Sequence, residues 1–176
     1  MNIVKTQLPV DSILNKLGNK YDYVDSFKGQ IRTHRDFTPT EVGRAFFSSA
    51  PDWVEKLMGL RNKIVGVFGL KTSNKNPLSR EEPFDNFKCE PNERLGLFKI
   101  FNKTDKEVIL GEDDKHLDFR VSLFLENSST NKFLTISTTV KFNNWLGRIY
   151  FLPVQPFHRF IVPAMLKSII KELEKC

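Results

Sequence analysis

The densest group of ionisable residues lies between Gly111 and Arg120, in the run GEDDKHLDFR. If this run is a strand, its side chains alternate between two faces, so His116, Asp118 and Arg120 share one face and the intervening apolar residues share the other. Neighbours on one face lie about 7 Å apart. A carboxylate and a guanidinium at that spacing can orient the imidazole and tune it for acid–base work near neutral pH. We therefore predict these three residues as candidate catalytic or ligand-orienting groups.

Two other interpretations of this row stay open. A charge-rich strand face in an antiparallel sheet is commonly solvated, with an Asp–Arg pair that is only structural. A metal site would join His116 and Asp118 to Asp113 or Asp114, which are suitable ligand types, but a second histidine and a recognised ligand spacing are missing. We predict no metal and no cofactor. Whether the row faces the core or the solvent is expected to decide between a functional site and a solvated, structural face.

A second group of polar residues lies among aromatic residues near the end of the chain. Its candidate ligand-binding residues are Arg148, Tyr150, His158 and Arg159. His158 and Arg159, close to the start of a helix, can hold an anionic group with the help of free backbone N–H donors. The alternative is that the neighbouring aromatics are core and the polar groups only solvate them; these aromatics are Trp145, Tyr150, Phe151 and Phe157.

Composition bounds the classes of protein to consider. A chain of 176 residues with 40% hydrophobic content is expected to form one domain over residues 1–176. The net charge is +6, but the basic residues are dispersed, so we predict no nucleic-acid partner. Sixteen phenylalanines indicate aromatics in a core or lining an apolar pocket. Nucleophile elbows, Walker loops, dinucleotide-binding glycine turns, HExxH and paired-cysteine motifs are absent from the sequence.

The compartment is predicted from what the sequence lacks. No apolar run reaches the length of a membrane-spanning helix. The first residues lack the apolar segment and cleavage site of a secretory signal. The two cysteines, Cys89 and Cys176, are too few for a disulfide framework and are expected to be free thiols. We predict a cytoplasmic protein without a membrane span.

Apolar periodicity predicts an α+β protein. A brief helix is predicted to end at Gly18, and a first strand to cover 21–31. Two helices follow. The first begins at Thr38-Pro39-Thr40-Glu41, and the second begins at Ser49 and ends at Gly69. A polar stretch, 71–94, precedes four strands of an antiparallel meander, predicted at 96–101, 107–111, 116–126 and 132–142. A long amphipathic helix at 157–175 closes the fold, with Pro163 either beginning its regular part or bending it.

This order of elements resembles the START-related helix-grip superfamily, also called the polyketide cyclase-like (SRPBCC) fold, in which a curved antiparallel sheet wraps around one C-terminal helix. Four sequence runs further resemble an uncharacterised bacterial domain family without an assigned activity: 96–98 (GLF), 110–120 (LGEDDKHLDFR), 146–150 (LGRIY) and 156–163 (PFHRFIVP). The resemblance covers nearly the whole chain. Helix-grip domains include lipid carriers, receptors, cyclases and chaperone activators, so the fold alone leaves the function open.

The resemblance implies a domain that binds a small hydrophobic or amphipathic molecule in an apolar cavity. The polar candidate residues named above would orient the bound molecule. The alternative is an enzyme that uses cavity His, Asp and Arg side chains for acid–base chemistry on a ring or carbonyl compound. A third hypothesis is a domain that binds a protein partner through an exposed apolar patch around Trp145. We favour a non-enzymatic role.

Overall fold

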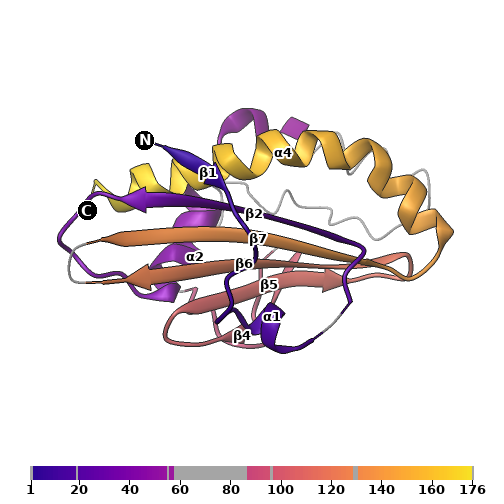
Figure 1. Cartoon of the computed structure of the whole chain (residues 1–176), viewed down its shortest axis with the longest axis horizontal. Helices are drawn as coiled ribbons and strands as arrows, with labels where there is room; N and C mark the ends of the chain where they lie inside the picture. The colour runs from indigo at the N-terminus through magenta and orange to yellow at the C-terminus, as the bar shows by residue number, and fades with distance from the viewer. Residues whose placement is uncertain are drawn as a thin grey trace.

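The computed structural model describes residues 2–18, 20–54, 56–57, 87–95, 97–128 and 131–175. Within them the chain forms an α+β fold, with a curved, seven-stranded antiparallel sheet and a long C-terminal helix (Figure 1). This confirms the predicted class and the predicted sheet type.

The sheet is a meander extended at both ends, with strand order β1-β2-β7-β6-β5-β4-β3. Strands β4 to β7 are the four predicted meander strands, and β2 pairs with β7 to continue the sheet. The sequence did not predict β1, whose three residues are too few to show a periodicity. The strands are β1 (Ile3–Lys5), β2 (Tyr23–Ile31), β3 (Arg94–Leu95), β4 (Phe98–Lys103), β5 (Glu107–Asp113), β6 (Leu117–Asn127) and β7 (Lys132–Phe142).

Helices cover both faces of this sheet unequally. Helix α4 (Trp145–Leu173) packs along β2 and β7, and α2 (Pro39–Ser48) packs beside it over β5 and β6. We call the face covered by these two helices the inner face. The short α1 (Ile13–Lys16) lies on the opposite, outer face (Figure 1).

Strand alternation determines what each face carries. On the inner face of β6, Val121, Leu123 and Leu125 are buried in the main hydrophobic core, together with Leu166 and Ile169 of α4. The residues between them on β6 point to the outer face, as a period of two requires. A long, buried apolar row on one face therefore fixes the register of β6 and, with it, the face of every polar residue in the strand.

Local signals explain where the helices begin. Helix α2 starts as predicted, because Thr38 and Glu41 form a capping box. Residues 52–54 and 56–57 of the predicted second helix are helical, and the rest of that prediction lies outside the described residues. The same is true of most of the polar stretch 71–94, although Phe87 at its described end is buried.

Helix α4 begins at Trp145 rather than at the predicted Phe157. Asn144 caps it by accepting a hydrogen bond from the Gly147 backbone N–H over 3.2 Å. The earlier turns were not predicted because Pro153 and Pro156, which lack an N–H donor, usually lie outside helix interiors. Pro163 also lies within the helix, so it does not begin the element.

The first turn of α4 lies directly on the loop between β5 and β6. A Cβ atom at Gly147 would lie 2.0 Å from the carbonyl oxygen of His116. Only glycine permits this close approach, which fixes the start of α4 against the sheet. Of the helices in the described part of the chain, none combines the length and apolar content needed to cross a bilayer.

We expect the two sides of α4 to respond very differently to the same substitution. Leu166 is fully buried in the main core, whereas Leu152 on the same helix is 65% exposed. Leu166→Ala should lower the free energy of unfolding by about 2–5 kcal/mol, because it removes buried apolar surface and leaves a cavity. Leu152→Ala should change it by less than about 0.5 kcal/mol. Urea denaturation followed by circular dichroism measures both values, and similar losses in the two variants would contradict this packing.

Candidate functional site

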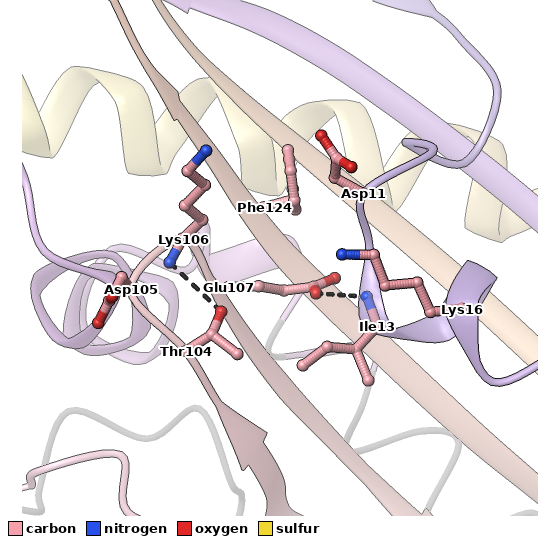
Figure 2. A pocket seen from close by; sticks show the side chains of 8 residues that line it. All are labelled: Asp11, Ile13, Lys16, Thr104, Asp105, Lys106, Glu107 and Phe124. Carbon is pink, nitrogen blue, oxygen red and sulfur yellow. Dashed lines mark hydrogen bonds between the residues drawn. The ribbon is translucent and has the colours of Figure 1, made fainter.

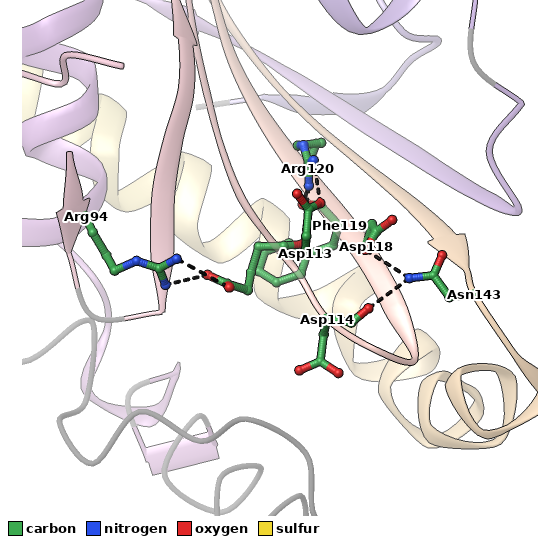
Figure 3. A network of polar contacts seen from close by, with 8 residues as sticks. Arg94, Asp113, Asp114, Asp118, Phe119, Arg120 and Asn143 are labelled. Atoms are coloured by element: carbon green, nitrogen blue, oxygen red, sulfur yellow. Dashed lines mark hydrogen bonds and ion pairs between the residues drawn. The ribbon is translucent and has the colours of Figure 1, made fainter. Parts of the chain in front are cut away.

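Of the predicted row, Asp118 and Arg120 lie on the outer face of β6 (Figure 3), and His116 lies in the turn before the strand. His116 precedes β6, and its Nδ1 lies 3.1 Å from Oδ1 of Asn144, the residue that caps α4. Asp118 accepts a hydrogen bond of 3.0 Å from the side-chain amide of Asn143. These contacts connect the β5–β6 turn to the segment that leads into α4.

Arg120 is held by several partners on the same outer face. Its guanidinium lies 2.6 Å from the carboxylate of Asp113 and donates to the backbone carbonyls of Glu112 and Phe119. It also stacks 3.5 Å from the centre of the Phe101 ring, a cation–π geometry. Asp118 and Arg120 thus point away from α4, and the apolar residues between them point toward it.

The metal hypothesis gains no support here. Among the described residues, no group of three His, Cys, Asp or Glu side chains is placed to hold a metal ion. Asp113, one of the two carboxylates considered as further ligands, is instead the ion-pair partner of Arg120. A second ion pair nearby joins Arg94 to Glu112 over 2.5 Å (Figure 3).

The second predicted group is spread along the N-terminal half of α4. Arg148 is 68% exposed, and its guanidinium lies 3.7 Å from Asp22. Tyr150 is half-buried against a small apolar cluster, whereas Arg159 is exposed. The interpretation of the surrounding aromatics as core is right for Phe151, which is buried, and wrong for Trp145 and Phe157, which are exposed.

His158 takes part in a polar contact that the sequence did not predict. The buried carboxylate of Asp25 is 4% exposed, and its Oδ2 accepts a hydrogen bond of 2.8 Å from the Tyr23 hydroxyl. The same oxygen lies 3.0 Å from Nδ1 of His158. Asp25 and Tyr23 stand on the inner face of β2, so this contact joins the sheet to α4.

Two polar atoms beside this contact are buried without a hydrogen-bond partner within the described part of the chain. They are Oδ1 of Asp25 and Oγ1 of Thr138. Asp25 and Thr138 are directly paired across β2 and β7, so both side chains occupy neighbouring places on the inner face. Burying such atoms unpaired is unfavourable and uncommon in native proteins. We call Tyr23, Asp25, Thr138 and His158 the inner polar group.

The inner polar group lies between two apolar clusters. Along β2 and β7, the pair Asp25–Thr138 falls between Phe27–Ile136, which belong to the main core, and Tyr23–Val140, which belong to the smaller cluster. Phe119 of β6 packs against both clusters. Polar atoms are therefore placed between two apolar surfaces beneath α4.

Electrostatics in the group follow from its burial. Burial raises the pKa of Tyr23 above its ordinary value, and both the hydrogen bond to Asp25 and the negative charge of that carboxylate raise it further. The positive charge of Arg159 opposes this shift. Tyr23 is thus kept neutral, and its hydroxyl is a hydrogen-bond donor over the whole physiological pH range.

A different polar centre lies on the outer face, under α1. Glu107 is 1% exposed and accepts hydrogen bonds from Ser12, from Ser122 and from the backbone N–H of Ile13. It forms one wall of an open pocket of about 380 Å³ beside Lys16 (Figure 2). Because its carboxylate is already bonded to three donors, Glu107 fixes the start of α1 to the sheet and offers little to a ligand.

Comparison with known proteins gives one match. Residues 17–165 match the family described as "Protein of unknown function (DUF2867)". The chain belongs to this family. No curated protein and no solved structure matches the chain. The matched region, residues 17–165, includes the whole inner polar group. The match confirms the predicted resemblance to an uncharacterised domain family.

One member of the inner polar group was predicted from the sequence, and the other three were not. His158 was a candidate, but its partners were not, because the charge-rich run around His116 is the stronger pattern in the sequence. A usable signal was present in the predicted first strand, where Asp25 occupies the same face as Tyr23 and Phe27. A lone carboxylate on an otherwise apolar strand face is a buried group that needs a partner.

We expect the raised pKa of Tyr23 to make the protein less stable at alkaline pH. A group with a raised pKa in the folded state contributes stability below its unfolded pKa, here about 10, and loses that contribution as the pH rises above it. The free energy of unfolding should therefore fall more steeply above about pH 10 in the natural protein than in Tyr23→Phe. Urea denaturation across this pH range measures both slopes, and parallel slopes would contradict the burial of this hydroxyl.

Proposed function

We propose that the chain binds a small amphipathic molecule between the inner face of the sheet and α4, with the polar end of the molecule at the inner polar group. The observation that carries the proposal is the pair of buried, unpartnered atoms, Asp25 Oδ1 and Thr138 Oγ1, on neighbouring strands of one face. A single polar group of a bound molecule that formed hydrogen bonds with both atoms would remove the free-energy cost of burying them unpaired.

The chemistry of these two atoms suggests which polar group fits. The free carboxylate oxygen of Asp25 accepts a hydrogen bond, and the Thr138 hydroxyl has a proton to donate. A ligand hydroxyl, which both donates and accepts, satisfies the two atoms together; an amide can do the same. The apolar part of such a molecule would lie against the clusters on either side, which Phe119 joins.

Tyr23 and His158 have a positioning role in this proposal. Both hold Oδ2 of Asp25, which leaves Oδ1 directed to the ligand. The His158 side chain is 18% exposed and that of Asp25 is 3% exposed, so the imidazole lies between the carboxylate and the surface. Of the other predicted ligand-binding residues, Tyr150 and Arg159 lie on the same helix, while His116, Asp118 and Arg120 could serve only a separate site.

The arrangement of the sheet and α4 supports assignment to the helix-grip superfamily, in which a single domain encloses its ligand beneath the last helix. We propose this assignment together with a single domain over 1–176 and a cytoplasmic location. The fold alone leaves the function open, and the inner polar group is the feature of this chain that supports ligand binding.

Acid–base catalysis is the second candidate, and one distance favours it. Nδ1 of His158 lies 3.0 Å from the buried carboxylate of Asp25, so the carboxylate can fix the imidazole and leave Nε2 as a base. The substrate would then be a ring or carbonyl compound held in the same place. This hypothesis uses His158 and Asp25 rather than the row at His116, Asp118 and Arg120.

The first test is to identify what the protein binds. Native mass spectrometry of protein purified from a bacterial host, followed by denaturing extraction, should reveal a retained compound with an apolar body and a hydroxyl or amide group. Incubation of that compound with apo protein separates the two candidates, because a binding protein returns it unchanged and an enzyme converts it.

A matched pair of variants tests the site with 2-naphthol, an aromatic ring with one hydroxyl. Thr138→Val removes the unpartnered hydroxyl on the inner face without removing a hydrogen bond inside the protein. It should weaken 2-naphthol binding about 2- to 10-fold, the worth of one hydrogen bond, without lowering stability. Fluorescence titration measures the affinity.

Thr135→Val is the control, because Thr135 is equally buried, also lacks a partner for its hydroxyl, and lies on the outer face of the same strand. Its affinity for 2-naphthol should equal that of the natural protein. Equal affinities for all three proteins, or no binding by any, would overturn the proposed site.

A further inference from the structure

The N-terminal half of α4 exposes a continuous apolar ridge. Trp145, Ile149, Leu152 and Phe160 are 67%, 52%, 65% and 72% exposed. Their spacing of four, three and eight residues places them on one side of the helix, with the exposed Pro156 filling the remaining step. Leu146 and Phe157 extend the ridge on one flank. The buried residues of α4 lie on its other side, so the helix is apolar on both sides over this half.

Single exposed apolar side chains are ordinary, but a contiguous group of this size indicates a surface that makes contacts. Figure 1 shows this half of α4, in orange, at one end of the molecule and over the end of the sheet. The ridge is convex, as the outside of a helix must be. Such a face can enter a soft apolar layer.

The charges of α4 indicate the partner. From Trp145 to Lys171 the helix has no acidic residue, and its charged residues are all basic: Arg148, Arg159, Lys167 and Lys171. All four are exposed. A second copy of the chain would bring like charges together across a symmetric contact, which is unfavourable. An anionic lipid surface offers both the apolar layer and the opposite charge.

We propose that the exposed side of α4 docks onto an anionic lipid bilayer surface. Trp145, Ile149, Leu152 and Phe160 enter the boundary between headgroups and acyl chains, and the basic residues contact lipid phosphates. The helix lies parallel to the bilayer plane while its buried side stays packed on the sheet. This inference is independent of the proposed ligand, because it uses the opposite side of α4 from His158.

Co-flotation with vesicles tests the inference. The natural protein should float with vesicles of phosphatidylcholine and phosphatidylglycerol, and binding should fall about tenfold on phosphatidylcholine alone or in high salt. Leu152→Ser and Phe160→Ser should each reduce binding to the mixed vesicles about tenfold, since each removes one inserted apolar side chain. Both residues are exposed, so thermal unfolding should be unchanged.

Val10→Ser is the matched control, because Val10 is 81% exposed and lies on the N-terminal segment rather than on α4. Its binding should equal that of the natural protein. Absence of flotation in the natural protein would overturn the inference, as would an equal loss in the Val10→Ser variant. A dimer by light scattering that Phe160→Ser dissociates, without any vesicle binding, would also overturn it and would assign the ridge to a second copy.

Discussion

In the described part of the chain, the fold depends on one constraint: the long helix α4 and its short neighbour α2 must cover the inner face of a seven-stranded sheet. Because strand side chains alternate, this coverage sorts every residue of the sheet to one environment or the other. The buried apolar row along β6 fixes which side chains of this strand face the helices. A shift of the strand register by one residue would turn the charged residues toward the helices and the apolar residues toward the outer face. The close approach of Gly147 to His116 then fixes where the helix begins on the sheet.

The same constraint explains why the inner polar group is unusual. A face covered by a helix is expected to be apolar, and Asp25 and Thr138 depart from that rule in the middle of it. Tyr23 and His158 stabilise one oxygen of the carboxylate and leave the other unpaired. Local rules that fail in an otherwise consistent core tend to do so at functional sites. The outer charged row follows the ordinary pattern, because Arg120 pairs with Asp113 of the neighbouring strand β5 and Asp118 accepts a hydrogen bond from Asn143, just before α4.

Periodicity was sufficient to predict most of the sheet and the class of the fold, because the meander strands are long and their buried positions recur regularly. The start of α4 could not be predicted in the same way, since Pro153 and Pro156 contradict local helix propensity and the packing of the helix on the sheet overrides it. The candidate site was predictable only in part. His158 is recognisable as a chemical group, but its pairing with Asp25 joins residues far apart in the chain, and no local pattern reports such a contact.

The ends of the sheet bear on how the protein behaves at high concentration. In the described part of the chain, both outermost strands are very short: β1 has three residues and β3 has two. An exposed strand edge offers unpaired N–H and C=O groups to other chains, and brief terminal strands reduce the length over which such pairing can spread. Each of the long, apolar strands β5, β6 and β7 is paired on both sides. The segments with the greatest tendency to self-associate into fibrils are thus shielded as long as the sheet remains intact.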